Sequence, residues 1–287
     1  MTKPALARPT LRAAVWMLGA ILSLTTMAIA GRQLSTELST FQILFFRSFF
    51  GLLVIVLLIY QTGRSVIKTR RLGLHMLRNL AHFAGQYGWF FGIALIPLTE
   101  VFAIEFTTPL WTAVIAVVLL GERMNAMRIG GTLLGFLGTL IILRPGAGVM
   151  SVGALAVLGA SLAYAFSHSM TKRLSSTDPP LAIVFYMCLI QLPLALLPAL
   201  LAGWVWPSAP AWPWVLLVAL CGLLAHYCMA RAFKLADASL VVPIDFLRLP
   251  LVAVIGYLAY REKLDPWVMI GALVVVAGTW INLRSTR

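Results

Sequence analysis

The chain has 287 residues, of which 61% are hydrophobic and only 11% are charged, and its mean hydropathy is +0.95. A soluble domain carries about 25% charged residues, so this composition excludes an ordinary soluble protein and indicates a membrane protein. The formal net charge of +13 would suggest nucleic-acid binding in a soluble protein, but here the positions of the basic residues give it a different meaning.

Ten apolar segments are each long enough to cross the roughly 30 Å of hydrocarbon in a bilayer as an α-helix. In chain order they lie near residues 13–31, 41–60, 73–96, 99–120, 127–143, 152–171, 181–202, 212–235, 238–260 and 267–283. Short connections join them and leave no room for a soluble domain. The sequence therefore predicts an all-α membrane protein with ten transmembrane helices.

Basic residues are concentrated in every second connection. The rich set is Lys3, Arg8, Arg12, Arg64, Lys68, Arg70, Arg71, Arg123, Arg128, Lys172, Arg173, Lys234, Arg284 and Arg287, and the poor set is Arg32, Arg144, Arg261 and Lys263. Because basic residues favour the cytoplasmic side of a membrane, both termini are predicted to be cytoplasmic. We expect a multi-pass protein of the cell inner membrane, with the lipid bilayer as a partner and no nucleic acid.

The second half of the chain repeats the first at an offset of 140 residues. Ile104-Glu105-Phe106 aligns with Ile244-Asp245-Phe246, and Glu122 aligns with Glu262. We therefore predict two five-helix domains, residues 1–146 and 147–287. Because five is odd, the second copy enters the membrane from the opposite side, and the pair forms an inverted repeat. The first span imitates a secretory signal, but its internal counterpart predicts that it is retained.

The end of each half carries a recognisable pattern. "PLWTAVIAVVLLGERMNAMRIGGTLLGFLGTLIIL" and "PLVAVIGYLAYREKLDPWVMIGALVVVAGTWINL" resemble the EamA-type drug/metabolite transporters, and "FQILFFRSFFG", with Arg47, resembles the arginine that this family carries in its second span. The resemblance covers the whole chain. It implies a ten-helix inner-membrane carrier of small metabolites, often an exporter of amino acids. The second half departs from the pattern, because Met187 replaces the arginine and Arg261 replaces a glycine.

Charged residues lie inside the apolar spans. A charge at the bilayer centre costs roughly 2.5–3.5 kcal/mol on insertion scales, so Glu105 and Asp245 are expected to point into the protein, on spans that face each other across the pseudo-two-fold axis. An amino acid carries both a carboxylate and an ammonium group, and Arg47 and Arg248 supply the opposite charge. Either these residues contact a substrate, or they pair with one another and hold helices together.

Polar side chains also follow helical spacing. Asn79, His82 and Gln86 share one face of the third span, and the residue after them, Tyr87, lies 140 residues before Tyr227. We expect the polar stripes to converge on one central cavity. The candidate substrate-binding residues are therefore Glu105, Asp245, His82, Gln86, Tyr87, Tyr164, His226, Tyr227, Arg47 and Arg248.

Two further features allow a structural interpretation. Gly131, Gly135 and Gly138 form a small-residue face that favours close helix packing, either inside the protein or at a dimer interface. Glu262, at the end of a span, is expected to act as a local ion-pair partner or a helix-end anchor, as is Glu122 in the first half.

The function predicted from these observations is secondary transport of small metabolites such as amino acids by alternating access, with export as the expected direction. A membrane-embedded enzyme and a passive channel are the alternatives. The sequence contains no HExxH, GxSxG or GxxxxGK[ST] motif, so we predict no catalytic residues, no metal and no cofactor, and transport driven by gradients. The small-molecule substrate, the coupling ion and the oligomeric state are left open, with a monomer as the simplest case.

Overall fold

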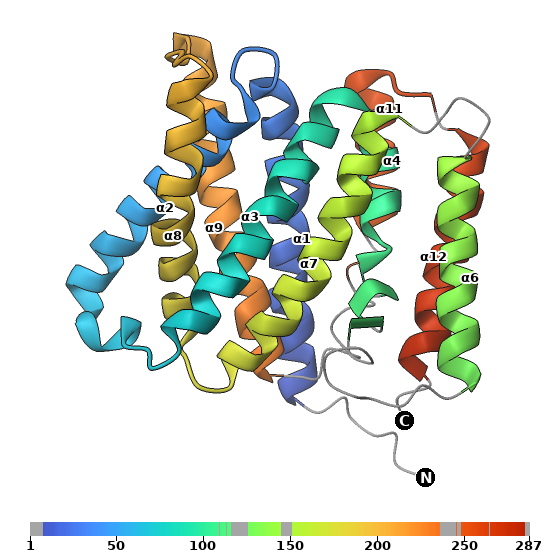
Figure 1. The fold of residues 1–287 in the computed structure, drawn as a ribbon, viewed down its shortest axis with the longest axis horizontal. Helices are drawn as coiled ribbons and strands as arrows, with labels where there is room; N and C mark the ends of the chain where they lie inside the picture. Colours follow the sequence, from blue (N-terminus) through green and yellow to red (C-terminus); the bar gives the residue numbers. More distant parts are fainter. Residues whose placement is uncertain are drawn as a thin grey trace. The chain divides into compact units, whose positions relative to one another are not determined.

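The computed structural model describes residues 8–108, 110–112, 114–115, 126–144, 151–235, 245, 248–263 and 265–284. The α-helices in this part of the chain are α1 (Arg8–Leu34), α2 (Thr40–Thr62), α3 (Leu72–Leu95), α4 (Leu98–Glu105), α6 (Ala126–Leu143), α7 (Val152–Ser175), α8 (Pro180–Leu201), α9 (Trp212–Leu235), α11 (Arg248–Tyr260) and α12 (Pro266–Arg284) (Figure 1). Each predicted span overlaps one of them. The protein is therefore an all-α membrane protein, as predicted.

Within the described part of the chain, five segments are long and apolar enough to cross a membrane by length and composition alone: Arg12–Leu34, Thr40–Gln61, Val152–Ser175, Pro180–Leu201 and Ala209–Leu235. Residues 129–143 and 266–278 form shorter apolar helices. Helix α3 is missing from the long set although it has 24 residues. Its sequence includes His75, Arg78, Asn79 and His82, and these polar residues lower its hydropathy.

The helix ends follow local sequence rules. Ser39 precedes α2 and accepts a hydrogen bond from the Gln42 backbone, while the Gln42 side chain accepts one from the Ser39 backbone. This reciprocal capping box satisfies donors that the first turn of a helix leaves without partners. Helix α8 begins with Pro180 in its first turn, where the missing N–H of proline costs nothing.

The described chain divides into two compact units. Unit 1 contains residues 1–83 and 170–245, and unit 2 contains residues 84–169 and 246–287. Both units draw on both halves of the sequence, and the division falls within α3 and α7. The domain boundary predicted between residues 146 and 147 lies outside the described residues and stays a prediction.

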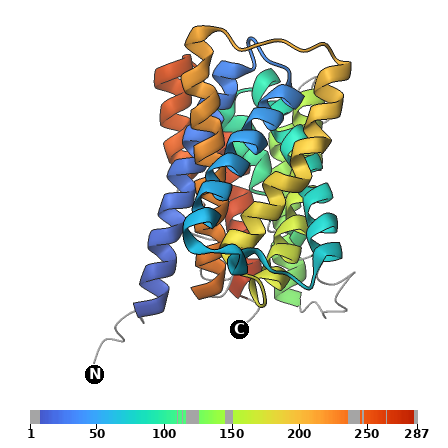
Figure 2. The same ribbon diagram turned by 90° about the vertical axis from the view of Figure 1, so that its left-hand side faces the viewer.

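In unit 1, α1 packs along α9, and α2 packs against α8 and α9. Cys228 lies in one apolar cluster with Met17 and Ala20, and Cys188 lies in another with Ile55 and Val184. Figure 2 shows the helices of this unit with the α8–α9 connection at one end and the short 3-10 helix η1 (Arg64–Ile67) at the other. The cysteines act here as small apolar packing residues.

In unit 2, α6 packs along α12, and α4 packs against α11, α12 and α6. The close contacts at the α6–α12 crossing occur twice, at glycine positions that are 140 residues apart in the sequence. A Cβ atom on Gly138 would lie 2.7 Å from the Gly271 carbonyl oxygen, and one on Gly278 would lie 2.6 Å from the Gly131 carbonyl oxygen. The glycine face of the fifth span therefore serves close packing inside the unit.

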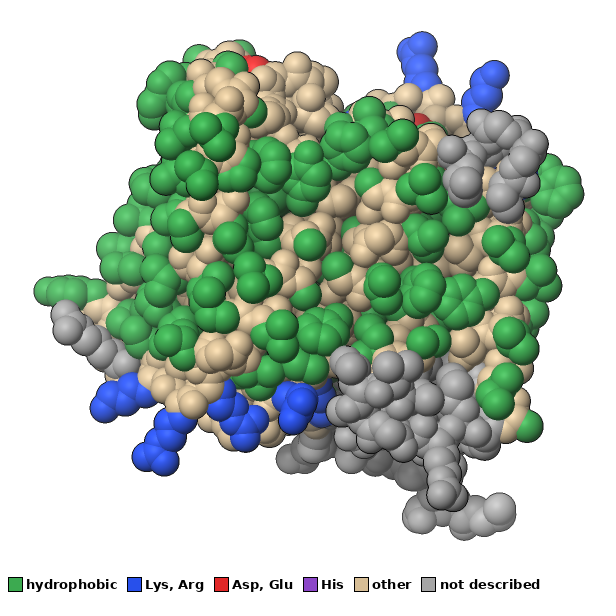
Figure 3. All heavy atoms as spheres, in the orientation of Figure 1, with side chains coloured by type: hydrophobic (Ala, Val, Ile, Leu, Met, Phe, Trp, Pro, Cys, Tyr) green, Lys and Arg blue, Asp and Glu red, His purple; other side chains and the backbone are tan. Residues whose placement is uncertain are grey.

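Exposed basic side chains lie at helix ends of unit 1, namely Lys68, Arg70 and Arg71 in the α2–α3 connection and Lys172 and Arg173 in the last turn of α7. In Figure 3, lysine and arginine side chains lie along the lower edge of the visible face and also at its upper right edge, and hydrophobic side chains cover much of the surface between the two edges. This distribution is the one expected of helices whose sides face lipid and whose ends reach the headgroups.

Candidate functional site

Helix α3 carries a continuous polar stripe. His75, Asn79, His82, Gln86 and Trp89 follow one another at spacings of four and three residues, so they share one helix face, and none is more than 2% exposed. The structure thus extends the stripe that the sequence predicted by one turn at each end. His75, Asn79 and His82 belong to unit 1, whereas Gln86 and Trp89 belong to unit 2.

In unit 2 the carboxylate of Glu105 is held on both oxygens. Its Oε1 lies 3.1 Å from Arg248 Nη2, and its Oε2 accepts a hydrogen bond of 2.8 Å from Trp89 Nε1. The Arg248 side chain is 2% exposed and that of Glu105 is 14% exposed. The guanidinium also lies over the rings of Phe102 and Phe106, at 4.8 Å and 5.6 Å from their centroids.

This arrangement follows from the cost of burying charge. A buried ion needs an opposite charge and further hydrogen bonds to offset its desolvation, and aromatic faces add attraction for a guanidinium. Glu105 and Arg248 therefore form the internal ion pair that the sequence analysis left open as an alternative. Trp89 was not predicted as a partner of Glu105, although its position seven residues after His82 places it on the same face of α3.

In unit 1, a second polar network surrounds Gln191 of α8. Its Oε1 accepts a hydrogen bond of 3.4 Å from Arg47 Nη1, and its Nε2 lies 2.9 Å from His82 Nδ1 and 3.3 Å from Asn79 Oδ1. The His82 ring meets the His226 ring edge to face, with centroids 4.6 Å apart. Gln191 thus links three helices, and the sequence analysis did not single it out.

Arg47 also contacts the residue that occupies its repeat position. Its Nη2 lies 3.8 Å from Met187 Sδ, and the two residues are 140 apart in sequence. Helices α2 and α8 therefore meet at equivalent positions, as expected of repeats related by a two-fold axis. Because the second copy has methionine here, the pair contributes only one guanidinium.

Arg78 is a buried cation that the sequence analysis missed. It is 2% exposed, its Nε donates to Thr171 Oγ1 at 3.1 Å, and its Nη1 donates to Asn79 Oδ1 at 2.6 Å. Asn79 in turn donates to the His75 carbonyl at 2.8 Å. A basic residue next to the polar stripe of a membrane helix was the available signal for it.

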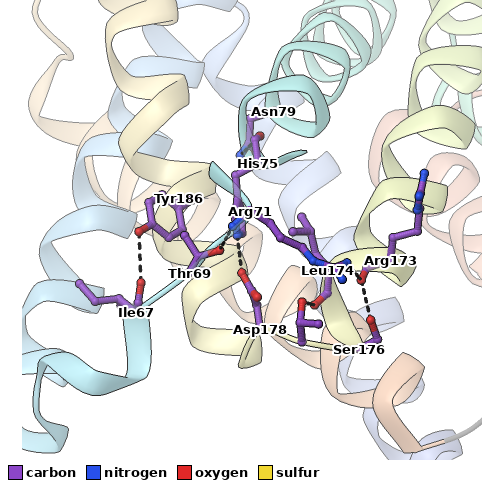
Figure 4. Close-up of polar contacts among 11 residues, drawn as sticks. Ile67, Thr69, Arg71, His75, Asn79, Arg173, Leu174, Ser176, Asp178 and Tyr186 are labelled. Atoms are coloured by element: carbon purple, nitrogen blue, oxygen red, sulfur yellow. Dashed lines mark hydrogen bonds and ion pairs between the residues drawn. The ribbon is translucent and has the colours of Figure 1, made fainter. Parts of the chain in front are cut away.

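Figure 4 shows the cluster at the first turn of α3, where Asp178 points at the His75 ring. His75 Nε2 lies 2.8 Å from Asp178 Oδ2. Burial alone would raise the pKa of the Asp178 carboxyl, but hydrogen bonds from Thr69, His75 and Thr177 outweigh burial and hold that pKa below its ordinary value of 3.8. This pair joins α3 to the α7–α8 connection.

The remaining candidates have more ordinary surroundings. Tyr164 stacks on His168 with centroids 5.9 Å apart, and Tyr87 stacks on Phe91 at 6.0 Å. Tyr227 meets Trp16 edge to face at 5.9 Å. Each of the three tyrosines thus has an aromatic neighbour, and its role in substrate binding stays a prediction.

The predicted site residues divide between the units. Arg47, His82, His226, Tyr227 and Asp245 belong to unit 1, and Gln86, Tyr87, Glu105, Tyr164 and Arg248 belong to unit 2. Asp245 is half-buried, but residues 236–244 and 246–247 beside it lie outside the described part of the chain. The predicted apposition of Glu105 and Asp245 stays a prediction.

Glu262 acts as a helix-end anchor, one of the two roles predicted for it. Its Oε1 accepts a hydrogen bond of 2.9 Å from the Leu98 backbone N–H, at the start of α4. An acidic group at a helix N-terminus satisfies a free donor and is stabilised by the helix dipole. Glu122, its predicted counterpart, lies outside the described residues.

Comparison with known proteins agrees with the family resemblance seen in the sequence. The family described as "EamA-like transporter family" matches residues 11–144 and 151–284, one copy in each half of the chain. A solved crystal structure superposes with a TM-score of 0.68 at 22% sequence identity, covering 94% of this chain and 95% of that one. At that identity the likeness shows the fold alone.

Three curated proteins illustrate the range of relatives. An S-adenosylmethionine uptake transporter of Rickettsia bellii is 27% identical and covers 95% of this chain and 93% of its own length. A riboflavin transporter of Vibrio cholerae is 30% identical, with 96% of each chain covered. A pseudopaline exporter of Pseudomonas aeruginosa is 28% identical, with 89% of this chain and 90% of its own covered.

Proposed function

Because the chain belongs to the EamA-like transporter family, we propose that it is a secondary carrier that moves a small, charged metabolite across the membrane by alternating access. The observation that carries this proposal is the burial of a guanidinium and a carboxylate together among apolar helices, in a chain built of two copies of a transporter repeat. Ionisable groups inside a membrane protein typically mark a transport path.

The proposed mechanism uses the two-fold repeat. If the second copy is inverted, the two conformations that open to opposite sides are related by symmetry, and rocking one part of the bundle against another exchanges them. In this proposal both termini are cytoplasmic, because the exposed basic residues gather in one set of connections. We also propose that the protein lies in the cell inner membrane and catalyses no chemical reaction.

We propose a zwitterionic substrate, either an amino acid or a metabolite that carries an amino-acid group. This class is supported by buried charges of both signs. Glu105 carries the negative charge, and Arg47 and Arg248 carry the positive charges. The relatives are named for S-adenosylmethionine, riboflavin and pseudopaline, so their names do not fix the cargo. Their names include both uptake and export, and outward transport is proposed here from the family resemblance.

The ion pair between Glu105 and Arg248 gives this proposal a chemical step. A substrate ammonium group takes the place of Arg248 beside Glu105, and a substrate carboxylate takes the place of Glu105 beside Arg248. Each buried charge then keeps an opposite partner throughout, so neither is left uncompensated in a low-dielectric interior. An uncharged analogue offers no such exchange and is expected to be a poor substrate.

Uptake into liposomes tests the proposed function. The purified protein is reconstituted, and uptake of radiolabelled amino acids, S-adenosylmethionine and riboflavin is measured against protein-free liposomes. The proposal expects saturable uptake of at least one zwitterionic compound and its loss in Glu105→Gln, with Glu37→Gln as the matched surface control. Flux that rises linearly with concentration would support a channel, and a chemically altered product would support an enzyme.

A further inference from the structure

We propose that Arg47 and Gln191 form a second carboxylate-binding site, distinct from the Glu105–Arg248 pair, and that a proton on His82 makes this site available. The proposal rests on the carrier function argued above and deepens it, because it assigns a carboxylate site and a coupling proton to named residues of unit 1. Gln191 acts as the positioning residue between the two, and its amide is the only group that touches both Arg47 and His82 in the hydrogen bonds described here.

Hydrogen-bond chemistry fixes the orientation of the Gln191 amide. A guanidinium can only donate, so the Gln191 atom that faces Arg47 Nη1 at 3.4 Å is the carbonyl oxygen. The amide nitrogen therefore faces His82 Nδ1 at 2.9 Å, and because this nitrogen only donates, His82 Nδ1 must accept. Neutral His82 consequently carries its proton on Nε2.

The neighbouring amide is held more firmly. Asn79 Oδ1 accepts from Arg78 at 2.6 Å, and Asn79 Nδ2 donates to the His75 carbonyl at 2.8 Å. Both ends of Asn79 thus have short hydrogen bonds. By contrast, the Gln191 bonds to Arg47 and to Asn79 are long, at 3.4 Å and 3.3 Å, so Gln191 is the amide that can turn at low cost.

A proton on His82 Nδ1 reverses this arrangement. The protonated ring is a donor at both nitrogens, so its Nδ1–H would oppose the Gln191 NH₂ group. A half-turn of the amide presents Oε1 to His82 instead, and it gives up the long bond to Asn79. Arg47 Nη1 then faces an NH₂ group and has lost its acceptor on Gln191.

The vacated position on Arg47 suits a carboxylate. Guanidinium and carboxylate groups form charge-assisted hydrogen bonds that are roughly twice as strong as neutral ones. Binding of the anion releases Gln191 Oε1 and so favours the proton on His82, which means that one carboxylate and one proton bind together. The pair adds no net charge to the membrane interior, where uncompensated charge is costly.

The backbone of α9 leaves space for the guanidinium. A Cβ atom on Gly222 would lie only 2.5 Å from Arg47 Nε and 3.2 Å from Met27 Sδ. Any side chain at this position would therefore displace Arg47. The absence of a side chain at residue 222 is what allows Arg47 to lie beside α9 at this depth.

Within the described part of the chain, the helices around His82 carry no Asp or Glu. Along α1 there is no titratable residue between Arg12 and Arg32, and α2 contributes Arg47. The other titratable residues are Tyr60 on α2, His75, Arg78 and Tyr87 on α3, Tyr186 and Cys188 on α8, and Cys221, His226, Tyr227, Cys228, Arg231 and Lys234 on α9. Helix α7, which packs against α3 at Gly85 and Gly88, adds Tyr164, His168, Lys172 and Arg173. These helices therefore carry several cations and no carboxylate, and the described acidic residues of unit 1, Glu37, Asp178 and Asp245, lie outside them.

Nitrogen-15 NMR of histidine-labelled protein in detergent micelles tests the proposal directly. The chain has four histidines, and the variant His82→Gln assigns the signal of His82. The probe is acetate, which replaces chloride at equal ionic strength and constant pH. The wild type is compared with two variants. Gln191→Leu has no amide to couple Arg47 to His82, and Gln191→Glu places a permanent carboxylate beside Arg47. The His168 signal, from unit 2, serves as an internal control.

In the wild type we expect neutral His82 to carry its proton on Nε2, and acetate to raise its ratio of protonated to neutral ring about tenfold or more. Gln191→Leu is expected to abolish the acetate response, and Gln191→Glu is expected to give protonated His82 without acetate. A neutral ring protonated on Nδ1 in the wild type would overturn the proposal, and this result does not depend on whether any variant folds. An acetate-insensitive His82 in the wild type, or an unchanged response in Gln191→Leu, would overturn it equally.

The transport assay separates this proposal from the carrier function. Saturable uptake together with an acetate-insensitive His82 would overturn the coupling and leave the carrier. Absence of uptake for every compound together with an acetate-linked proton on His82 would overturn the carrier and leave a proton-linked anion site.

Discussion

Removing the charge of Glu105 should destabilise the protein, because it leaves the guanidinium of Arg248 buried without its carboxylate. Glu105→Gln preserves the shape of the side chain, while Arg248 is only 2% exposed. Breaking a buried ion pair from one side costs about 3–5 kcal/mol. The contacts of Arg248 with Phe102 and Phe106 remain, so the lower end, about 3 kcal/mol, is expected. At about 2 °C per kcal/mol for a large chain, the melting midpoint falls by about 6 °C.

Thermal unfolding in mild detergent, followed by circular dichroism, measures this effect. The matched control is Glu37→Gln, because Glu37 accepts from the backbone and hydroxyl of Ser208 at an exposed position and should change stability by less than about 1 kcal/mol. The double variant Glu105→Gln/Arg248→Leu should recover most of the loss, since both buried charges are then gone. If Glu105→Gln melted at the same temperature as Glu37→Gln, the buried pair would not be the stabilising feature described here.

Three further predictions concern single positions. Gly138→Ala places a methyl group 2.7 Å from backbone atoms of α12 and should cost about 1–3 kcal/mol, whereas Gly130→Ala, with nothing within 4 Å, should be neutral or stabilising by up to about 1 kcal/mol; equal melting midpoints would refute the tight crossing. Asp178→Asn should destabilise the protein at neutral pH. Because the pKa of Asp178 in the folded protein lies below 3.8, its carboxylate stabilises the fold above pH 3.8, and this stabilisation is lost as the pH falls through the folded pKa. A difference in melting midpoint between the variant and the wild type that persists in acid would contradict this sign. Glu262→Ala should cost about 0.5–2 kcal/mol and speed amide hydrogen exchange at the start of α4; unchanged exchange there would exclude the capping role.

The sequence predicted the helices well because hydrophobic length is a strong signal in membrane proteins. The exception is the fourth span, predicted over residues 99–120, where α4 ends at Glu105 and Phe106 and Thr107 form a turn. Pro109 has no N–H to donate to the Glu105 carbonyl, and the Thr108 hydroxyl donates to that carbonyl instead, at 2.6 Å. Hydrophobic length does not show this break, but Pro109 marks it in the sequence.

The site was only partly predictable. The stripe on α3 follows from helical spacing within one segment, so Asn79, His82 and Gln86 could be found without a structure. The partners could not, because the contacts of Gln191 with His82 and of Trp89 with Glu105 depend on how helices far apart in sequence pack. The repeat offset did supply one such contact, since Arg47 meets Met187 at equivalent positions.

The central claim, that this chain is an alternating-access carrier, is tested most directly by counterflow in proteoliposomes. Vesicles are loaded with an unlabelled substrate, diluted into a trace of the same labelled compound, and followed without any ion gradient. A carrier is predicted to accumulate label transiently above the outside concentration, because each return of the binding site is accelerated by internal substrate. Label that only approaches equilibrium, at a rate independent of the unlabelled load, would contradict the claim.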